Sequence, residues 1–392
     1  MRTQLSSCLA ICGLMLCAAP LVYGTRLQQQ RPVTVAQRRV SKPLTDLIRR
    51  LPKAELHVHV EGTLEPELMF KLAERNNITL PYPDVAAAKA ARSKFTNLQS
   101  FLDAYHVSET VLLKRQDFKD LAAAYFEEAA ANNITHVELF FDPQSHMARG
   151  VTFGDVYDGL QAAITARRTH PSHPIDVTLV ICFDRQLGQL AAAKALAAAL
   201  PYIGGVSALG MGGAEVGHPP ENYRDVYSTG GLLGLHKVAH AGEEGGPEYV
   251  WGAIRALHVQ RIDHGIRSLE DPQLVRYMAD TRLPITLCPL SNLHLQVYAG
   301  SLEEKLRAIL ASGIVVTINS DDPAYFSGYL NTNYKYLAAV ADLGAGDITR
   351  LVRNSFAASF ISGEQKLQAY AQIREVLAAW TQEQQHDHVA VS

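Results

Sequence analysis

Eight short apolar runs recur along this chain, and stretches with helical patterning separate them. Continuous apolar runs between helices are typical of parallel strands that are buried on both faces. Eight of them predict an α/β fold, a (β/α)8 TIM barrel with extra helices after the first strand. A doubly wound open sheet is the alternative, but no Gly-x-Gly-x-x-Gly motif follows the first run. The predicted strands are Ala54–Val60, His136–Phe141, Ile175–Phe183, Val206–Met211, Lys237–His240, Arg261–His264, Ile285–Cys288 and Ile314–Asn319.

The two ends of the chain differ from the barrel domain that we expect over residues 51–381. One early basic residue followed by an apolar stretch from Leu9 to Val22 is typical of a secretory signal peptide, so we assign residues 1–24 to one. Basic and polar residues predict a flexible linker over residues 25–50 and a polar tail over 382–392. The expected location is a bacterial periplasm or the medium, without a membrane anchor after cleavage. An uncleaved anchor, or a misassigned start codon and a cytoplasmic protein, is the alternative.

The charge balance narrows the choice of partners. Lys and Arg total 36 against 39 Asp and Glu, and 47% of the residues are apolar. The chain therefore has material for a large core, and it lacks the basic excess that binding to nucleic acid requires. After signal cleavage only Cys182 and Cys288 would remain, so no disulfide framework is expected.

Imidazole and carboxylate side chains stand at the ends of four predicted strands, and a barrel gathers these ends into one site. His57 and His59 lie two residues apart, so they project to the same side of the first strand and can share a metal ion. The adjacent carboxylates of Asp321 and Asp322 repel each other unless a cation lies nearby. Three imidazoles with one carboxylate suit a borderline ion such as Zn²⁺. The four segments are His57–His59, His240–Glu243, Asp263–Gly265 and Ser320–Asp322.

These segments resemble the motifs of the adenosine/adenine deaminase family of the amidohydrolase superfamily, and the resemblance extends from about Leu51 to about Leu377. It implies a TIM barrel with one zinc ion per chain, bound by His57, His59, His240 and Asp321. It also implies that Glu243 donates a proton to the purine ring, that His264 holds and polarises the attacking hydroxide, and that Asp322 contacts water and substrate. The motifs are ELHVHVEGT (55–63), HAGE (240–243), RIDHG (261–265), CPLSN (288–292) and SDDPAYF (320–326).

Within this family, the residues after the first histidine pair resemble the enzymes that act on the free base. Glu61-Gly62-Thr63 stands where adenosine deaminases usually carry Asp-Gly-Ala, whose acid reaches the ribose. We therefore expect Glu61 to occupy the space of a ribose, Phe141 to tighten the pocket, and the backbone amide of Gly213 to contact the purine. The predicted reaction converts adenine to hypoxanthine and ammonia. Adenosine, or an adenine substituted at N6, is the alternative substrate.

Two other classes of function compete with this interpretation. A hydrolase of amides or esters with one zinc ion would use the same ligands, but it would not need the acid at Glu243 as a donor to N1. A secreted binding protein without catalytic activity would not need to keep ligands, acid and base together. Four further residues, His136, His146, Tyr325 and Phe326, either face the cavity or are structural, and we interpret Cys288 as structural.

Overall fold

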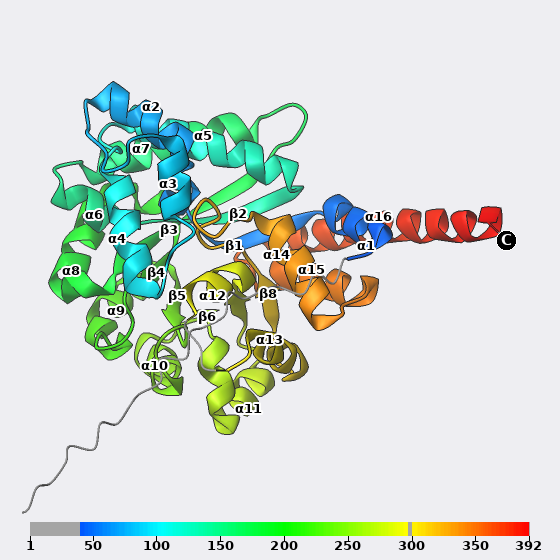
Figure 1. Cartoon of the computed structure of the whole chain (residues 1–392). Helices are drawn as coiled ribbons and strands as arrows, with labels where there is room; N and C mark the ends of the chain where they lie inside the picture. The colour runs from blue at the N-terminus through cyan, green and yellow to red at the C-terminus, as the bar shows by residue number, and fades with distance from the viewer. Residues whose placement is uncertain (1–39, 297–299, 392) are drawn as a thin grey trace, which may run out of the picture. The chain divides into compact units, whose positions relative to one another are not determined.

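Eight parallel strands form the centre of the fold and follow one another around the sheet in chain order (Figure 1). The structure is a computed structural model that describes residues 40–296 and 300–391, with the backbone alone for 387–391. Backbone bonds from His59 N to Asp321 O (3.0 Å) and from Asp321 N to His57 O (3.1 Å) join β1 to the segment after β8 and close the barrel. The strands are β1 Lys53–His59, β2 Ile134–Phe141, β3 Asp176–Asp184, β4 Val206–Gly212, β5 His236–Ala241, β6 Arg261–His264, β7 Ile285–Leu287 and β8 Val316–Ile318.

The predicted (β/α)8 barrel is therefore confirmed, and so are the extra helices after the first strand. α2 Pro66–Asn76, α3 Val85–Ala91 and α4 Leu98–Glu109 precede α5 Arg115–Ala131, which leads into β2. The later helices are α6 Pro143–Ala148, α7 Phe153–Arg168, α8 Gly188–Ala199, α9 Arg224–Leu232, α10 Pro247–Gly252, α11 Pro272–Thr281, α12 Pro289–Leu295, α13 Leu302–Ala311, α14 Leu330–Ala341, α15 Ala345–Ala358 and α16 Gly363–Val391. Within the described residues, no helix combines the length and hydropathy that crossing a membrane requires.

The two-residue period of the strands decides which side chains face the inside of the barrel. Phe140 on β2 packs inside with Val180, Ala208 and Val238 from the next strands. Its neighbour Phe141 points the other way and packs on Phe153 of α7, with ring centroids 5.7 Å apart. The prediction that Phe141 tightens the pocket was wrong, because the parity of the strand puts Phe140 there instead.

A buried ion pair lies inside the barrel below the level of Phe140. The guanidinium of Arg261 donates to Glu138 Oε2 at 2.6 Å and to the carbonyl of Leu56 at 3.0 Å. The second carboxylate oxygen of Glu138 accepts the backbone N–H of Phe360, also at 2.6 Å. A buried ion pair thus fills this part of the barrel. Hydrogen bonds to backbone groups on both of its members offset the cost of burying the two charges.

The segments before and after the barrel are more ordered than the sequence suggested. The predicted linker is wrong for its last nine residues, which form α1 Lys42–Arg50, because Leu47 and Ile48 are buried in the core. α16 continues through the predicted polar tail to Val391, and Arg50 of α1 pairs with Glu383 of α16 at 2.8 Å. The predicted signal peptide lies outside the described residues.

Candidate active site

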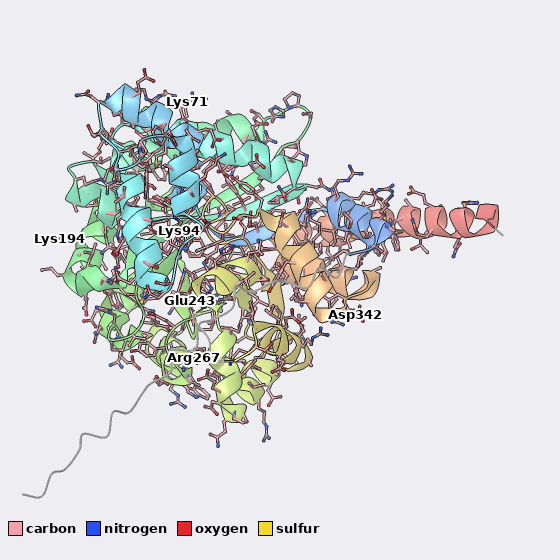
Figure 2. The ribbon with its side chains drawn as sticks, viewed as in Figure 1. Lys71, Lys94, Lys194, Glu243, Arg267 and Asp342 are labelled. Atoms are coloured by element: carbon pink, nitrogen blue, oxygen red, sulfur yellow. The ribbon has the colours of Figure 1, made fainter. Side chains whose placement is uncertain are left out.

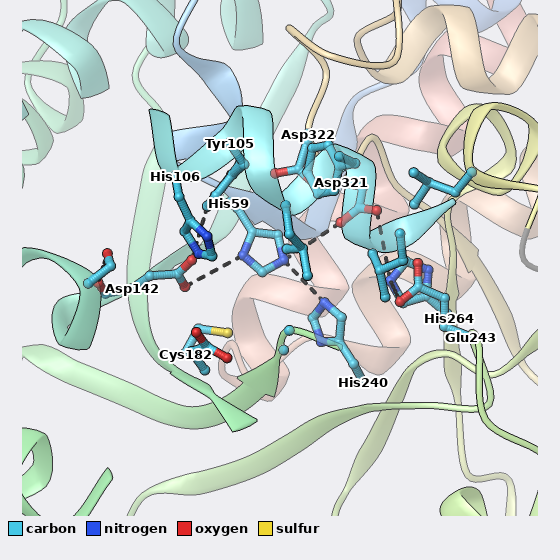
Figure 3. A pocket seen from close by; sticks show the side chains of 18 residues that line it. His59, Tyr105, His106, Asp142, Cys182, His240, Glu243, His264, Asp321 and Asp322 are labelled. Atoms are coloured by element: carbon cyan, nitrogen blue, oxygen red, sulfur yellow. Dashed lines mark hydrogen bonds and ion pairs between the residues drawn. The ribbon is translucent and has the colours of Figure 1, made fainter. Parts of the chain in front are cut away.

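Three imidazole nitrogens and one carboxylate oxygen converge at the carboxyl ends of the strands, and Figure 3 shows three of the four residues, His59, His240 and Asp321. The Nε2 atoms of His57 and His59 are 3.3 Å apart, and each lies within 3.2 Å of Nε2 of His240. Asp321 Oδ1 lies 3.1 Å from His57 Nε2 and 3.6 Å from His59 Nε2. All four residues are at most 6% exposed. The structure thus brings together the four residues that the sequence predicted as ligands.

This arrangement fits a small cation better than it fits mutual hydrogen bonding. A neutral imidazole carries only one N–H. When three Nε2 atoms face one another, they cannot all be paired donor to acceptor, and lone pairs are left pointing at each other. Atoms about 2.0 Å from a tetrahedral zinc ion lie roughly 3.3 Å from each other, which matches the three nitrogen separations. A fourth imidazole, that of His264, has its Nε2 3.8 Å from the other carboxylate oxygen of Asp321. The set can therefore hold a metal ion with His264 beside it.

A hydrogen-bonded chain behind His57 turns its Nε2 atom toward this centre. Nδ1 of His57 lies 2.9 Å from the Thr286 hydroxyl, which itself donates to Asp263 Oδ1 at 2.9 Å. Asp263 also lies 3.7 Å from Nδ1 of His240, beyond hydrogen-bond distance. Such partners fix the tautomer of a ligating histidine and raise its basicity. Asp263 belongs to the RIDHG motif, but the sequence interpretation gave it no role. Its position two residues after the buried Arg261 is a signal that it also faces the inside of the barrel.

The loop that carries Glu243 is held by one buried carboxylate. Glu215, which is 1% exposed, accepts hydrogen bonds from four successive backbone N–H groups, those of residues 242, 243, 244 and 245, at 2.8, 3.2, 2.9 and 2.7 Å. Arg267 donates to the carbonyl oxygen of Glu244 from the outer side. Figure 2 labels Glu243 near the middle of the ribbon and Lys194 on its periphery. The sequence analysis assigned no role to Glu215, although an acid that closely follows a glycine-rich strand end is a signal for one.

The protonation states of this end of the barrel follow from burial and crowded charge. Burial, reinforced by the nearby charge of Asp321, raises the pKa of Glu243 well above its usual range. The same two causes raise the pKa of Asp322. Burial lowers the pKa of His264 to about 3. Glu243 is therefore suited to donate a proton near neutral pH, and His264, whose Nε2 lies 3.6 Å from Glu243 Oε2, is held neutral, so that one of its ring nitrogens can accept a hydrogen bond.

A pocket opens above these residues, and α4 forms much of its wall. Leu98, Phe101 and Leu102 of this helix line the pocket together with Leu295. These apolar side chains can pack on a flat heterocyclic ring. The polar and small residues that line it are His59, Tyr105, His106, Asp142, Ser145, Cys182, Asp184, Gly212, Gly213, His240, Glu243, His264, Asp321 and Asp322.

Gly213 lines the pocket, in agreement with its predicted place. Its φ is +82°, and a Cβ built on it would come within 2.4 Å of Asp184 Oδ1. A side chain at this position would therefore meet both backbone strain and a clash, which explains why glycine stands there. Its backbone is left accessible to a ligand at the edge of the pocket.

Glu61 was predicted to occupy the space of a ribose, but in this structure it is buried and does not line the pocket. It sits in a 3₁₀ turn after β1 and is 1% exposed. One carboxylate oxygen lies 2.8 Å from Nε2 of His146 and accepts the backbone N–H of Asp142 at 3.1 Å. The carboxylate of Asp142, which the sequence analysis did not single out, lines the pocket instead.

The remaining candidates are structural in this fold. Tyr325 and Phe326 pack against Phe101 of α4 below the pocket wall, with ring centroids 5.4 and 4.9 Å away. His136 lies at the other end of β2, 3.1 Å from Asp176. Cys288 is buried with its sulfur 3.6 Å from Nδ1 of His57, on the side that faces away from the other ligands.

Comparison with known proteins agrees with this geometry. Residues 52–376 match the family model described as adenosine deaminase. The chain is 47% identical to adenine deaminase from Cupriavidus necator over 85% of this chain and 94% of that protein, and 48% identical to adenine deaminase from Acinetobacter baylyi over 85% and 99%. The crystal structure of adenine deaminase from Arthrobacter aurescens superposes with a TM-score of 0.81 at 39% identity, and covers 84% of this chain and 99% of that one.

Proposed function

Since this chain belongs to the adenosine deaminase family and is a purine deaminase, we propose that its substrate is adenine, which it hydrolyses to hypoxanthine and ammonia with one bound zinc ion. The observation that carries the choice of substrate is the similarity to adenine deaminases at 47–48% identity over 85% of the chain. The two relatives are matched over 94% and 99% of their own length.

Zinc is the ion that the donor set favours. Three imidazoles and one carboxylate at tetrahedral separations suit its borderline character. The proposed ligands are His57, His59, His240 and Asp321. When bound there, zinc lowers the pKa of a coordinated water toward neutrality and so supplies hydroxide near pH 7.

The side chains around this position divide the proton transfers between them. Glu243, protonated before the reaction, gives its proton to N1 of the purine, which makes C6 electrophilic. His264, neutral because it is buried, holds the attacking oxygen and takes up the proton that this oxygen loses. Asp322 accepts a hydrogen bond from the same oxygen. The amino group takes up the proton that His264 received and leaves as ammonia, and Glu243 regains its proton from the water that supplied the hydroxide, so nitrogen is exchanged for oxygen at C6.

The decisive experiment measures kcat/KM for adenine, adenosine and an N6-alkyl adenine on one preparation, with ammonia release as the readout and metal content determined in parallel. We expect about one zinc per chain and a preference for adenine. A tenfold preference for adenosine, about 1.4 kcal/mol of transition-state stabilisation, would reverse the assignment. Full activity after exhaustive chelation would refute the role of the metal.

We also propose that residues 1–24 direct export and are removed, since their pattern is that of a signal peptide. The mature protein would then begin near Thr25 and act outside the cytoplasm, most simply in a bacterial periplasm. The N-terminal sequence of protein from a native extract decides this. Intact Met1 in a cytosolic fraction would contradict it.

A further inference from the structure

We propose that Asp142 is the residue that selects the free base, by accepting a hydrogen bond from the N–H of the purine imidazole ring. This inference rests on the proposed function and deepens it. The carboxylate of Asp142 follows β2, its side chain is 18% exposed, and it lines the pocket. It is thus one of the polar groups that a bound ring can reach.

The position of Asp142 matches the end of the purine that lies away from N1. Glu243 follows β5 and Asp142 follows β2, three strands away around the barrel. Figure 3 shows the two carboxylates on opposite sides of His59 and His240. In a purine, N1 and the imidazole ring lie on opposite sides of the molecule. A substrate whose N1 contacts Glu243 and whose C6 faces the proposed ligands therefore directs its imidazole ring toward Asp142.

The carboxylate of Asp142 has acceptor capacity that the described residues do not use. Its Oδ2 accepts one hydrogen bond, from the hydroxyl of Tyr105 at 3.0 Å. Its Oδ1 is buried and has no partner within hydrogen-bond distance in the part of the chain that the structure describes, and Nδ1 of His59 lies 3.8 Å from it. Each oxygen of an ionised carboxylate has about two acceptor sites, so Oδ2 can accept an N–H of the substrate in addition to the hydroxyl of Tyr105.

Buried groups behind Asp142 fix its position. Its backbone N–H donates to Glu61 at 3.1 Å, and that carboxylate is itself held by His146 at 2.8 Å. Tyr105 approaches from α4 and is 4% exposed. Glu61 is therefore a positioning residue: it holds the backbone of Asp142, although its own side chain does not line the pocket.

The chemistry of this contact separates a base from a nucleoside. Adenine carries one N–H on its imidazole ring, whereas adenosine has a glycosidic bond to N9 and no N–H there. A site that hydrogen-bonds a substrate N–H discriminates strongly against analogues that lack it, because its buried polar group is then left unpaired. Asp142 would both bind adenine and reject substitution at N9.

The test compares adenine with 9-methyladenine, which keeps the reacting amidine but lacks the N–H at N9. In the wild-type protein we expect kcat/KM for adenine to exceed that for 9-methyladenine by at least 100-fold. Asp142→Asn keeps the shape of the side chain but removes its charge. It should lower kcat/KM for adenine by tenfold or more and leave that for 9-methyladenine within threefold of wild type, with zinc content unchanged.

The matched control is Asp184→Asn, because Asp184 is a second carboxylate that follows a strand and lines the same pocket. This variant should leave the ratio of kcat/KM for adenine to kcat/KM for 9-methyladenine unchanged. The inference is overturned if Asp142→Asn lowers kcat/KM for both substrates equally or loses zinc. It is also overturned if Asp184→Asn, and not Asp142→Asn, changes the ratio of the two kcat/KM values. If wild-type protein does not deaminate adenine at all, the proposed function itself fails, and this outcome is distinct from the others.

Discussion

The barrel buries charged side chains at two levels, and the two sets are satisfied in opposite ways. In the lower set, Arg261 and Glu138 bind each other at 2.6 Å and backbone groups take up further positions around the pair, so that within it only Arg261 Nε lacks a hydrogen-bond partner among the described residues. In the upper set, near the pocket, Asp322 Oδ1, Asp263 Oδ2 and His240 Nδ1 are buried and lack a hydrogen-bond partner among the described residues. The lower charges stabilise the fold as it stands, whereas the upper ones are arranged for a cation and a substrate.

The pKa values of two buried glutamates express this difference. The pKa of Glu138 is lowered to about 2: burial opposes this, but the charge of Arg261 and the contact with His136 outweigh it. The pKa of Glu243 is raised well above its usual range by burial and by Asp321. Replacing a glutamate should therefore cost stability in the lower set and activity in the upper one, a separation that is common at functional sites.

The largest expected effect is on turnover in Glu243→Gln. Glutamine keeps the shape of the side chain but cannot give a proton to N1, so kcat should fall by about 10³-fold or more while zinc content stays near one per chain. Ammonia release and metal analysis on the same sample measure both quantities. His240→Ala is the contrasting variant and should lose most of the zinc together with the activity. Near-wild-type turnover in Glu243→Gln would show that another group is the acid.

The matching change in the lower set is Glu138→Ala, which leaves Arg261 buried without its partner. Removing one member of a buried pair typically costs about 3–5 kcal/mol of folding stability. Denaturant unfolding should show this loss, while kcat per folded, zinc-loaded molecule stays within a few fold of wild type. A large fall in kcat of the folded fraction would mean that the two sets are coupled.

Acid titration provides a third comparison. The pKa of Glu138 is about 2 in the folded protein, and its ordinary value is 4.5. Its ionised form therefore contributes to the free energy of unfolding above pH 4.5, and this contribution is lost as the pH falls toward 2. The stability at stake is on the order of 3 kcal/mol, from about 1.4 kcal/mol for each pH unit of that window. In Glu138→Gln this part of the acid destabilisation should disappear. An unchanged pH dependence of the unfolding free energy would mean that protonation of Glu138 does not cause this loss of stability.

Much of this architecture could be predicted from the sequence, because buried parallel strands appear as continuous apolar runs and their ends can be located. His57 and His59 could be paired because a two-residue spacing keeps one face. The expectation that Phe141 lines the pocket was wrong, since the apolar run alone does not say which of two neighbouring residues faces inward. Glu61 was misplaced for a different reason: the chain leaves the strand in a 3₁₀ turn there, so the alternation stops.

What the sequence could not supply were contacts between strands that are far apart in the chain. Asp263 lies 3.9 Å from a histidine of β1 and 3.7 Å from one of β5, and Asp142 is held at the pocket by hydrogen bonds with Glu61 and Tyr105. Nothing local in the sequence encodes such partners, and they depend on how the barrel closes.

A smaller loss of turnover is expected from Glu215→Gln, which tests whether the loop of Glu243 needs its carboxylate clamp. An amide group facing four backbone N–H groups places donors against donors, so the loop should shift. We expect kcat to fall by about 10–30-fold, roughly 2 kcal/mol, with KM and zinc content nearly unchanged. Glu270→Gln is the control, because it removes the outer partner of Arg267 and leaves the clamp intact. A rise in KM without a change in kcat would contradict this role.

The smallest effect we expect is a gain in stability from Asp322→Asn in protein freed of metal by chelation. Burial and the adjacent Asp321 raise the pKa of Asp322, so its ionised form is less stable in the folded chain than in the unfolded one. The folded state then binds more protons, and stability falls as the pH rises above the ordinary value of 3.8. Asparagine removes this penalty, so the metal-free variant should be more stable at pH 7 by about 1 kcal/mol, although it should be almost inactive. Added zinc should stabilise the wild-type protein and reduce the difference, because the cation relieves the same repulsion. If the metal-free variant were less stable than wild type at pH 7, the crowded carboxylates would be a stabilising part of the fold, and the contrast between the two levels of the barrel would fail.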